Sequence, residues 1–192
     1  MNNSHLDFAT ILHRAATSAD RPTRSDLVDA LQAAEINARR EKLAIPFASL
    51  LGEWRLCFAT GASKPKKGGA IKLGRGYYLP QFVPASIAFT QLNEEPITGT
   101  VTNQLTVGAV KIKFDGPCRY PGKKNLLPFD FTKIELKIIG ATIYQGKIRS
   151  KRAGLDFAKL SIADLPFFAF FWASENCIAA RGRSGGLALW IK

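Results

Sequence analysis

The chain has 192 residues and a mass of 21.0 kDa, the size of one domain, and its 46% hydrophobic and 22% charged residues exclude disorder as its main state. The net charge of +12 comes entirely from residues 51–192, because six basic and six acidic groups balance in residues 1–50. Histidine occurs only at His5 and His13, and the three cysteines stand about sixty residues apart, which excludes a histidine-based mechanism in the main domain, a zinc site and a disulfide framework.

Residues 1–45 predict two helices. Ser4 begins the first, Ser18–Pro22 ends it, and Thr23 or Ser25 caps the second. Apolar residues recur at helical spacing in both segments. We therefore expect an N-terminal helical segment over 1–45 whose apolar stripe packs on the remainder of the chain, with a partner-binding helix as the alternative.

From about residue 50 the hydrophobic period becomes two, which is typical of strands with one apolar and one polar face. Turn signals such as Asp115–Pro117 and Pro121–Lys124 separate the strands. Residues 46–192 therefore predict eight to ten short strands in a meandering antiparallel barrel or sandwich. Residues 154–164 predict a short helix or an irregular strand.

The run Phe167–Trp172 is apolar at every position, which predicts a strand that is buried on both faces or rests on an apolar surface. The longest apolar run, Leu165–Ala173, has nine residues, whereas a membrane-spanning helix needs about 20. Small barrels of about eight strands are either filled by side chains or hold one small ligand. The 13 phenylalanines fit both cases.

Two motifs lie at opposite ends of the expected barrel. Leu50–Gly61 reads LLGEWRLCFATG, and its Gly-x-Trp resembles the lipocalin signature. Ala180–Trp190 reads ARGRSGGLALW. Together they resemble the first and last strands of the plastid lipid-associated protein (plant fibrillin) family. Only Glu175 remains of that family's C-terminal acidic cluster, so the chain resembles a shorter, cyanobacterial-type member better than a member of the plant subgroups.

The resemblance implies a mainly β fold, an antiparallel lipocalin-like β-barrel over 46–192 behind the helical segment. It implies non-enzymatic binding or carriage of a small hydrophobic molecule, such as a lipid, carotenoid or isoprenoid quinone, with no cofactor and no metal. It also implies an intracellular protein, peripheral to thylakoid membranes or lipid globules in a cyanobacterial cytoplasm or a plastid. Proteins of isoprenoid metabolism are expected partners.

Apolar positions of the predicted strands are the candidate ligand-binding residues of the barrel interior: Trp54, Leu56, Phe58, Phe89, Val110, Ile112, Phe114, Ile134 and Leu136. By resemblance, four residues close the barrel end: Gly52, Trp54, Arg181 and Gly182. In this arrangement the Arg181 guanidinium stacks on the Trp54 indole, a contact worth about 0.5–2 kcal/mol.

Three loops carry clusters of basic residues, namely Lys64, Lys66 and Lys67, then Lys123 and Lys124, then Arg149, Lys151 and Arg152. We expect them to contact an anionic membrane surface, with Tyr77, Tyr78, Phe82 and the run Phe167–Trp172 inserting at the interface. No recognition helix, RNP motif or zinc motif accompanies the charge, which disfavours nucleic acid. An oligonucleotide-binding basic barrel is the alternative function. The carboxylates Asp115, Asp130 and Glu135 form no catalytic motif.

Overall fold

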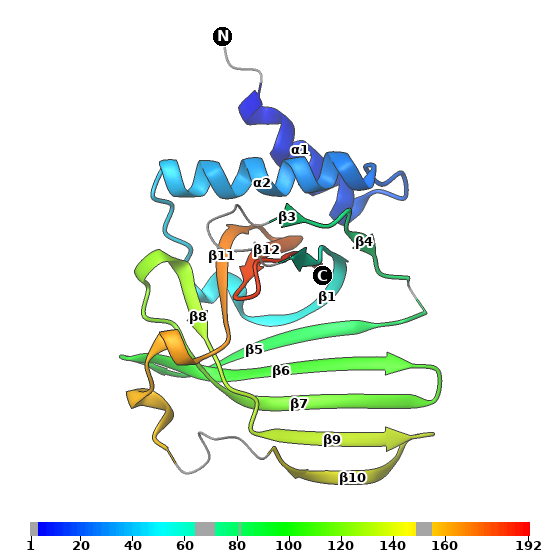
Figure 1. Ribbon diagram of the computed structural model, residues 1–192, viewed down its shortest axis with the longest axis vertical. Coiled ribbons are helices and arrows are strands. Elements are labelled where there is room, and N and C mark those ends of the chain that lie inside the picture. Colours follow the sequence, from blue (N-terminus) through cyan, green and yellow to red (C-terminus); the bar gives the residue numbers. More distant parts are fainter. Residues whose placement is uncertain (1–3, 64–71, 81, 149–154) are drawn as a thin grey trace.

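A computed structural model describes residues 4–63, 72–80, 82–148 and 155–192. Two helices lie over one side of a large curled antiparallel sheet (Figure 1). The fold is therefore mainly β with a small N-terminal helical segment, as the sequence predicts. None of the described helices is both long enough and apolar enough to cross a bilayer.

Helices α1 (Ser4–Thr17) and α2 (Arg24–Arg40) pack against each other and on the outside of the sheet. Thr23 is the N-cap of α2, since its hydroxyl accepts a hydrogen bond of 3.2 Å from the Asp26 N–H. The apolar stripe of α2, which includes Leu27 and Leu31, is buried. The prediction that the helical segment packs through one apolar stripe is confirmed.

The strands of the main sheet are β1 (Gly52–Ala59), β4 (Tyr77–Tyr78), β5 (Ala85–Glu94), β6 (Ile97–Val107), β7 (Val110–Arg119), β8 (Leu126–Pro128), β9 (Lys133–Ile138), β10 (Ala141–Lys147), β11 (Phe167–Ala173), β12 (Cys177–Gly182) and β13 (Leu187–Ile191). Their order is β10-β9-β7-β6-β5-β1-β13-β12-β11-β8, and β4 pairs with β1. Strands β2 (Ala62–Ser63) and β3 (Lys72–Leu73) form a separate pair.

The sheet curls until its β8 end meets β7 again. A β-bridge joins Cys118 to Phe129, and the Asp130 N–H donates 3.1 Å to the Pro117 carbonyl. Glycine at position 116 allows this approach, because an added Cβ would stand 1.7 Å from the Asp130 carbonyl oxygen. In the described part of the chain, eight strands thereby close into a ring, whose members are β7, β6, β5, β1, β13, β12, β11 and β8.

The other half of the β7 edge, Val110–Asp115, pairs with β9. Strands β9 and β10 therefore stay outside the ring. Together with the ends of β6 and β7 they form an open extension of the sheet, seen at the lower right of Figure 1. The closed ring and the open extension share strands β6 and β7, so one face of the sheet runs from the ring interior onto the extension.

Two apolar cores lie on the two faces of the ring. The inner core includes Trp54, Phe89 and Trp190, and the outer core lies beneath the helices. The 3₁₀ helix η1 (Phe47–Leu50) contributes to the inner core. Strand β11 takes part in both cores, with Phe168 and Phe170 inside and Phe171 and Trp172 under the helices. This confirms the prediction that the aromatic run is covered on both faces.

Residues 155–164 form two short 3₁₀ turns, η3 (Phe157–Lys159) and η4 (Ile162–Asp164), rather than a helix or a strand. The side chains of Asp156 and Ser161 cap them. The Arg119 guanidinium of β7 donates to the carbonyls of Ala158 and Leu160, which fastens the segment to the sheet. The 3₁₀ turn η2 (Lys123–Asn125) precedes β8.

Candidate functional site

The register of the extension places apolar side chains on one face. Residues that pair directly across antiparallel strands share a face, as do residues two apart along a strand. The pairing aligns Leu105 with Ile112, Ile112 with Leu136, and Leu136 with Tyr144. We call this surface the open apolar face: Leu105, Val110, Ile112, Phe114, Ile134, Leu136 and Tyr144.

The open apolar face continues the inner core of the ring. A chain of aromatic contacts starts at Trp190, whose ring centroid lies 5.3 Å from that of Phe168. It passes through Phe129 at 5.1 Å and Phe131 at 5.0 Å, and reaches Phe114 at 5.6 Å. Phe114 is only half-buried, as are its neighbours on this face. The apolar interior is therefore continuous with a surface that an apolar molecule can reach.

Side chains fill the ring itself. Trp54 and Phe89 are buried in the inner core, and Leu56 packs against it. The Phe89 and Phe170 rings meet edge to face at 5.9 Å in this core. Three of the predicted ligand-binding residues therefore pack the inner core. Five others lie together on the open apolar face: Val110, Ile112, Phe114, Ile134 and Leu136.

The prediction for Phe58 is wrong. A bulge between Leu56 and Phe58 in the pairing of β1 with β13 breaks the alternation. Both Cys57 and Phe58 belong to the outer core beneath the helices. The Phe58 ring meets that of Tyr78 at 5.0 Å, so it has no access to the inner face.

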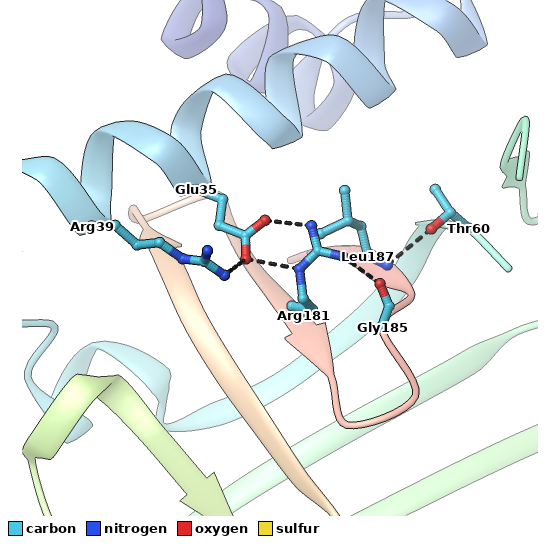
Figure 2. A network of polar contacts seen from close by, with 6 residues as sticks. All are labelled: Glu35, Arg39, Thr60, Arg181, Gly185 and Leu187. Carbon is cyan, nitrogen blue, oxygen red and sulfur yellow. Dashed lines mark hydrogen bonds and ion pairs between the residues drawn. The ribbon is translucent and has the colours of Figure 1, made fainter. Parts of the chain in front are cut away.

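The expected stack of Arg181 on Trp54 is also wrong. Alternation along β12 places Ala180 inside the ring and Arg181 outside, so Arg181 cannot reach Trp54. Arg181 instead binds Glu35 of α2 (Figure 2), with Nε donating 2.7 Å to Oε1 and Nη2 donating to Oε2. The Trp54 indole donates 2.9 Å to the Leu50 carbonyl, and Lys192 Nζ lies 5.1 Å from its ring centroid.

The two glycines of the expected closure have local roles. Gly52 begins β1 at a φ of 104°, in the region that favours glycine. The Gly182 N–H donates 2.9 Å to the Gly186 carbonyl in the turn between β12 and β13. Gly52 therefore serves the start of a strand and Gly182 a turn, and neither contacts a stack of Arg181 on Trp54.

The opposite face of the extension is polar and basic. It carries five lysines and two carboxylates, a net charge of +3, from these residues: Lys111, Lys113, Asp115, Lys133, Glu135, Lys137 and Lys147. Asp115 pairs with Lys113 at 3.2 Å, and Glu135 pairs with Lys137 at 3.2 Å. These lysines are visible in the sequence as the alternate residues of the predicted strands. Asp130 is buried where the ring closes, away from this face.

The tip of the extension exposes Val107, Ile138, Ile139 and Tyr144. Phe82 is exposed in the turn before β5, where the Thr106 N–H of β6 donates 2.9 Å to the Pro84 carbonyl, and we call these five residues the apolar rim. Ile139 and Phe82 are the most exposed, at 85% and 81%. Ile139 has a φ of 49° in the β9–β10 turn, which is unfavourable for a β-branched residue. The sequence predicts interfacial contact for Phe82 alone among these residues.

The predicted membrane-surface cations fall mostly outside the described residues. This applies to Lys64, Lys66, Lys67, Arg149, Lys151 and Arg152, and to the side chain of Lys123. Lys124 is exposed beside the end of α2.

The tyrosines predicted at the interface differ from each other. The Tyr78 hydroxyl donates 2.9 Å to the Pro22 carbonyl, and burial raises the pKa of Tyr78 to about 12. Tyr78 is therefore structural, whereas Tyr77 is 65% exposed.

Comparisons of the chain with protein-family models, curated proteins and solved structures found no match. The resemblance described above therefore depends on the two terminal motifs, and the function has to be argued from the site itself.

Proposed function

We propose that the protein binds a small hydrophobic molecule, of the lipid, carotenoid or isoprenoid quinone class, along the open apolar face, and that it does so without enzymatic activity. The observation that carries this proposal is the alignment of Ile112, Phe114, Ile134 and Leu136 on one half-exposed face next to the ring. A flat or elongated apolar molecule fits such a surface better than it fits the filled ring. The choice among these ligand classes draws on the motif resemblance.

Apolar burial supplies the affinity. A ligand that removes about 300 Å² of apolar surface from water gains about 7 kcal/mol before the entropic cost of association. The aromatic contacts behind Phe114 keep this surface rigid, so little side-chain entropy is lost on binding. The proposed binding therefore needs no large rearrangement of the sheet.

We place the site at an anionic membrane surface, as a second element of the proposal. The apolar rim suits insertion among headgroups, and the lysines of the opposite face each gain about 1 kcal/mol near anionic lipid. By resemblance to plastid lipid-associated proteins, the membrane is a thylakoid or a lipid globule, and proteins of isoprenoid metabolism are the partners.

The geometry of the extension disfavours the oligonucleotide alternative. Single-strand binding needs cations and stacking rings along the same groove. On the described strands of the extension, Phe114 and Tyr144 lie on the apolar face and the paired lysines lie on the other. A strand bound to the lysines would have no aromatic surface to stack on.

Titration with an isoprenoid quinone, followed by quenching of tryptophan fluorescence, tests ligand binding. Phe114→Ser is expected to weaken binding at least tenfold, because it removes the ring that links the face to the core. Lys113→Ser is the matched control, since it changes the adjacent residue on the other face, and it should leave binding unchanged. Equal binding by wild type and Phe114→Ser, in proteins of equal fold by circular dichroism, would contradict the proposal.

Co-sedimentation with vesicles tests the membrane element separately. Vesicles rich in phosphatidylglycerol should bind the protein, with an affinity that falls as salt rises, and neutral phosphatidylcholine vesicles should bind it weakly. The Lys111→Ala/Lys137→Ala double variant should lose at least threefold in affinity. Equal binding to both kinds of vesicle would contradict the electrostatic part of the proposal.

A further inference from the structure

A pocket of about 570 Å³ lies outside the ring, between the C-terminal half of α2 and the edge of β11. Strand β8 pairs with β11 from Phe167 to Ala169, and beyond that point no described strand lies beside this edge. The lining comes from the end of α2 and the residues after it, the loop before β8, and β11 itself: Glu35, Ala38, Arg39, Lys42, Leu43, Ala44, Gly122, Lys124, Asn125, Leu126, Ala169, Phe170 and Phe171. None of these belongs to the open apolar face.

The mouth of the pocket is positively charged. Arg39, Lys42 and Lys124 are exposed and come from two different segments of the chain. The one carboxylate of the lining, Glu35, is neutralised by Arg181 and also accepts 2.6 Å from Arg39 (Figure 2). Cations therefore outnumber carboxylates, and an anionic group is favoured at the mouth.

The backbone that presents two of these cations adopts an unfavourable conformation. Among the described non-glycine residues, four have positive φ, and three of them line this pocket: Lys42 at 50°, Lys124 at 57° and Asn125 at 50°. Lys42 follows α2 at the position where glycine is the usual residue. Left-handed residues with a Cβ persist where the surroundings fix them, and they concentrate at functional sites.

Asn125 fixes the two lysine-bearing segments to each other. Its Nδ2 donates 2.7 Å to the Leu43 carbonyl, and its Oδ1 accepts 3.0 Å from the Ile45 N–H. Asn125 is buried, and the Tyr120 hydroxyl donates 2.7 Å to the Ile45 carbonyl beside it. The backbones at Lys42 and Lys124 are therefore held in place before any ligand arrives.

The floor of the pocket is apolar, with contributions from Leu126, Ala169 and Phe171. We infer that the pocket binds an anionic amphiphile, a single apolar chain that ends in a carboxylate or a phosphate. The head group contacts Arg39, Lys42 and Lys124, and the chain lies along Leu126 and Phe171. The pocket volume of about 570 Å³ lies within the range of small-molecule sites. This site is independent of the function proposed for the open apolar face.

Isothermal titration calorimetry with five probes tests the ligand class, with each amphiphile kept below its micelle-forming concentration. Dodecanoate and dodecyl phosphate are expected to bind, and decanoate to bind about tenfold more weakly than dodecanoate because it lacks two methylenes. Dodecanol and inorganic phosphate should each bind at least tenfold more weakly than dodecanoate, because each lacks one half of the recognised chemistry. Dodecanol as tight as dodecanoate, or inorganic phosphate as tight as dodecyl phosphate, would overturn the inference.

Variants then test the location. Lys42→Gly/Lys124→Gly removes both cations and relieves the left-handed backbone, so it should weaken dodecanoate binding at least tenfold while urea stability stays equal or rises. Lys111→Ala/Lys137→Ala makes the same charge change on the extension and should leave dodecanoate binding unchanged. Unchanged binding by the glycine variant, or a loss of binding in Phe114→Ser instead, would place the amphiphile elsewhere and refute the site. Quinone binding is measured separately, so unchanged dodecanoate binding by the glycine variant leaves the proposal for the open apolar face standing.

Discussion

The ion pair between Glu35 and Arg181 is the main polar link between the helices and the ring. The side chain of Glu35 is 9% exposed and that of Arg181 is 19% exposed. Removing one member of a buried pair leaves the other charge desolvated, which costs about 3–5 kcal/mol. Arg181 keeps a hydrogen bond to the Gly185 carbonyl and some contact with water, so we expect Glu35→Ala to lower the free energy of unfolding by about 3 kcal/mol.

Urea denaturation of wild type and Glu35→Ala, followed by circular dichroism, measures this loss. Thermal denaturation should show a fall in Tm of about 6–12 °C, since 1 kcal/mol corresponds to about 2–4 °C in a domain of this size. Arg39→Ala is the matched control, because Arg39 is the other partner of Glu35. The side chain of Arg39 is 73% exposed. This variant should cost no more than about 0.5 kcal/mol.

The comparison of the two variants decides whether burial sets the strength of the pair. If Glu35→Ala lost under about 1 kcal/mol, or no more than Arg39→Ala, the pair would behave as a surface ion pair and α2 would be held by apolar packing alone. The double variant Glu35→Leu/Arg181→Met gives an independent check. It leaves no unpaired charge, so it should recover most of the loss seen in Glu35→Ala.

Three further changes test other parts of the structure. Ile139→Gly should raise the free energy of unfolding by about 1 kcal/mol, because it relieves the left-handed backbone, and should lower binding to anionic vesicles at least threefold; unchanged vesicle binding would remove Ile139 from the membrane-contacting rim. Leu31→Ala removes a fully buried side chain of α2 and should cost about 2–5 kcal/mol in urea denaturation, whereas a cost below 1 kcal/mol would mean that the helices pack loosely on the sheet. Burial raises the pKa of the Cys118 thiol from 9.0 to about 12, so the unfolded chain ionises first and the free energy of unfolding should fall by about 1 kcal/mol between pH 8 and pH 10 from this group; Cys118→Ala should show a shallower fall, and an equal fall would rule out this cause.

Local sequence signals predicted the elements well. The side chain of Thr23 and the break at Pro22 define where α2 begins, and both act within a few residues of the chain. Alternation along β7 and β9 predicted that Ile112 and Leu136 share a face, because the period of two is a property of the strand itself. The apolar character of Phe167–Trp172 likewise predicted a strand covered on both faces.

Features that depend on long-range pairing were not predictable in this way. The bulge that turns Phe58 outward arises in the pairing with β13, about 130 residues further along the chain. The partner of Arg181 is Glu35, from a helix 146 residues away, and no local pattern links them. The left-handed backbone at Lys42 and Lys124 carries no residue signal either, because glycine would be the expected residue at such positions.

The divided edge of β7 explains why the ring is filled while the face beside it stays open. Residues Val110–Asp115 pair with β9, and the segment between β8 and β9 reaches Cys118 through Phe129, Pro117 through Asp130 and Asp115 through Thr132. Gly116, at the junction, lets both pairings coexist by admitting the chain at Asp130. Replacement of Gly116 by alanine should therefore disturb the closure of the ring and the open apolar face together, which links the stability of the core to the geometry of the proposed site.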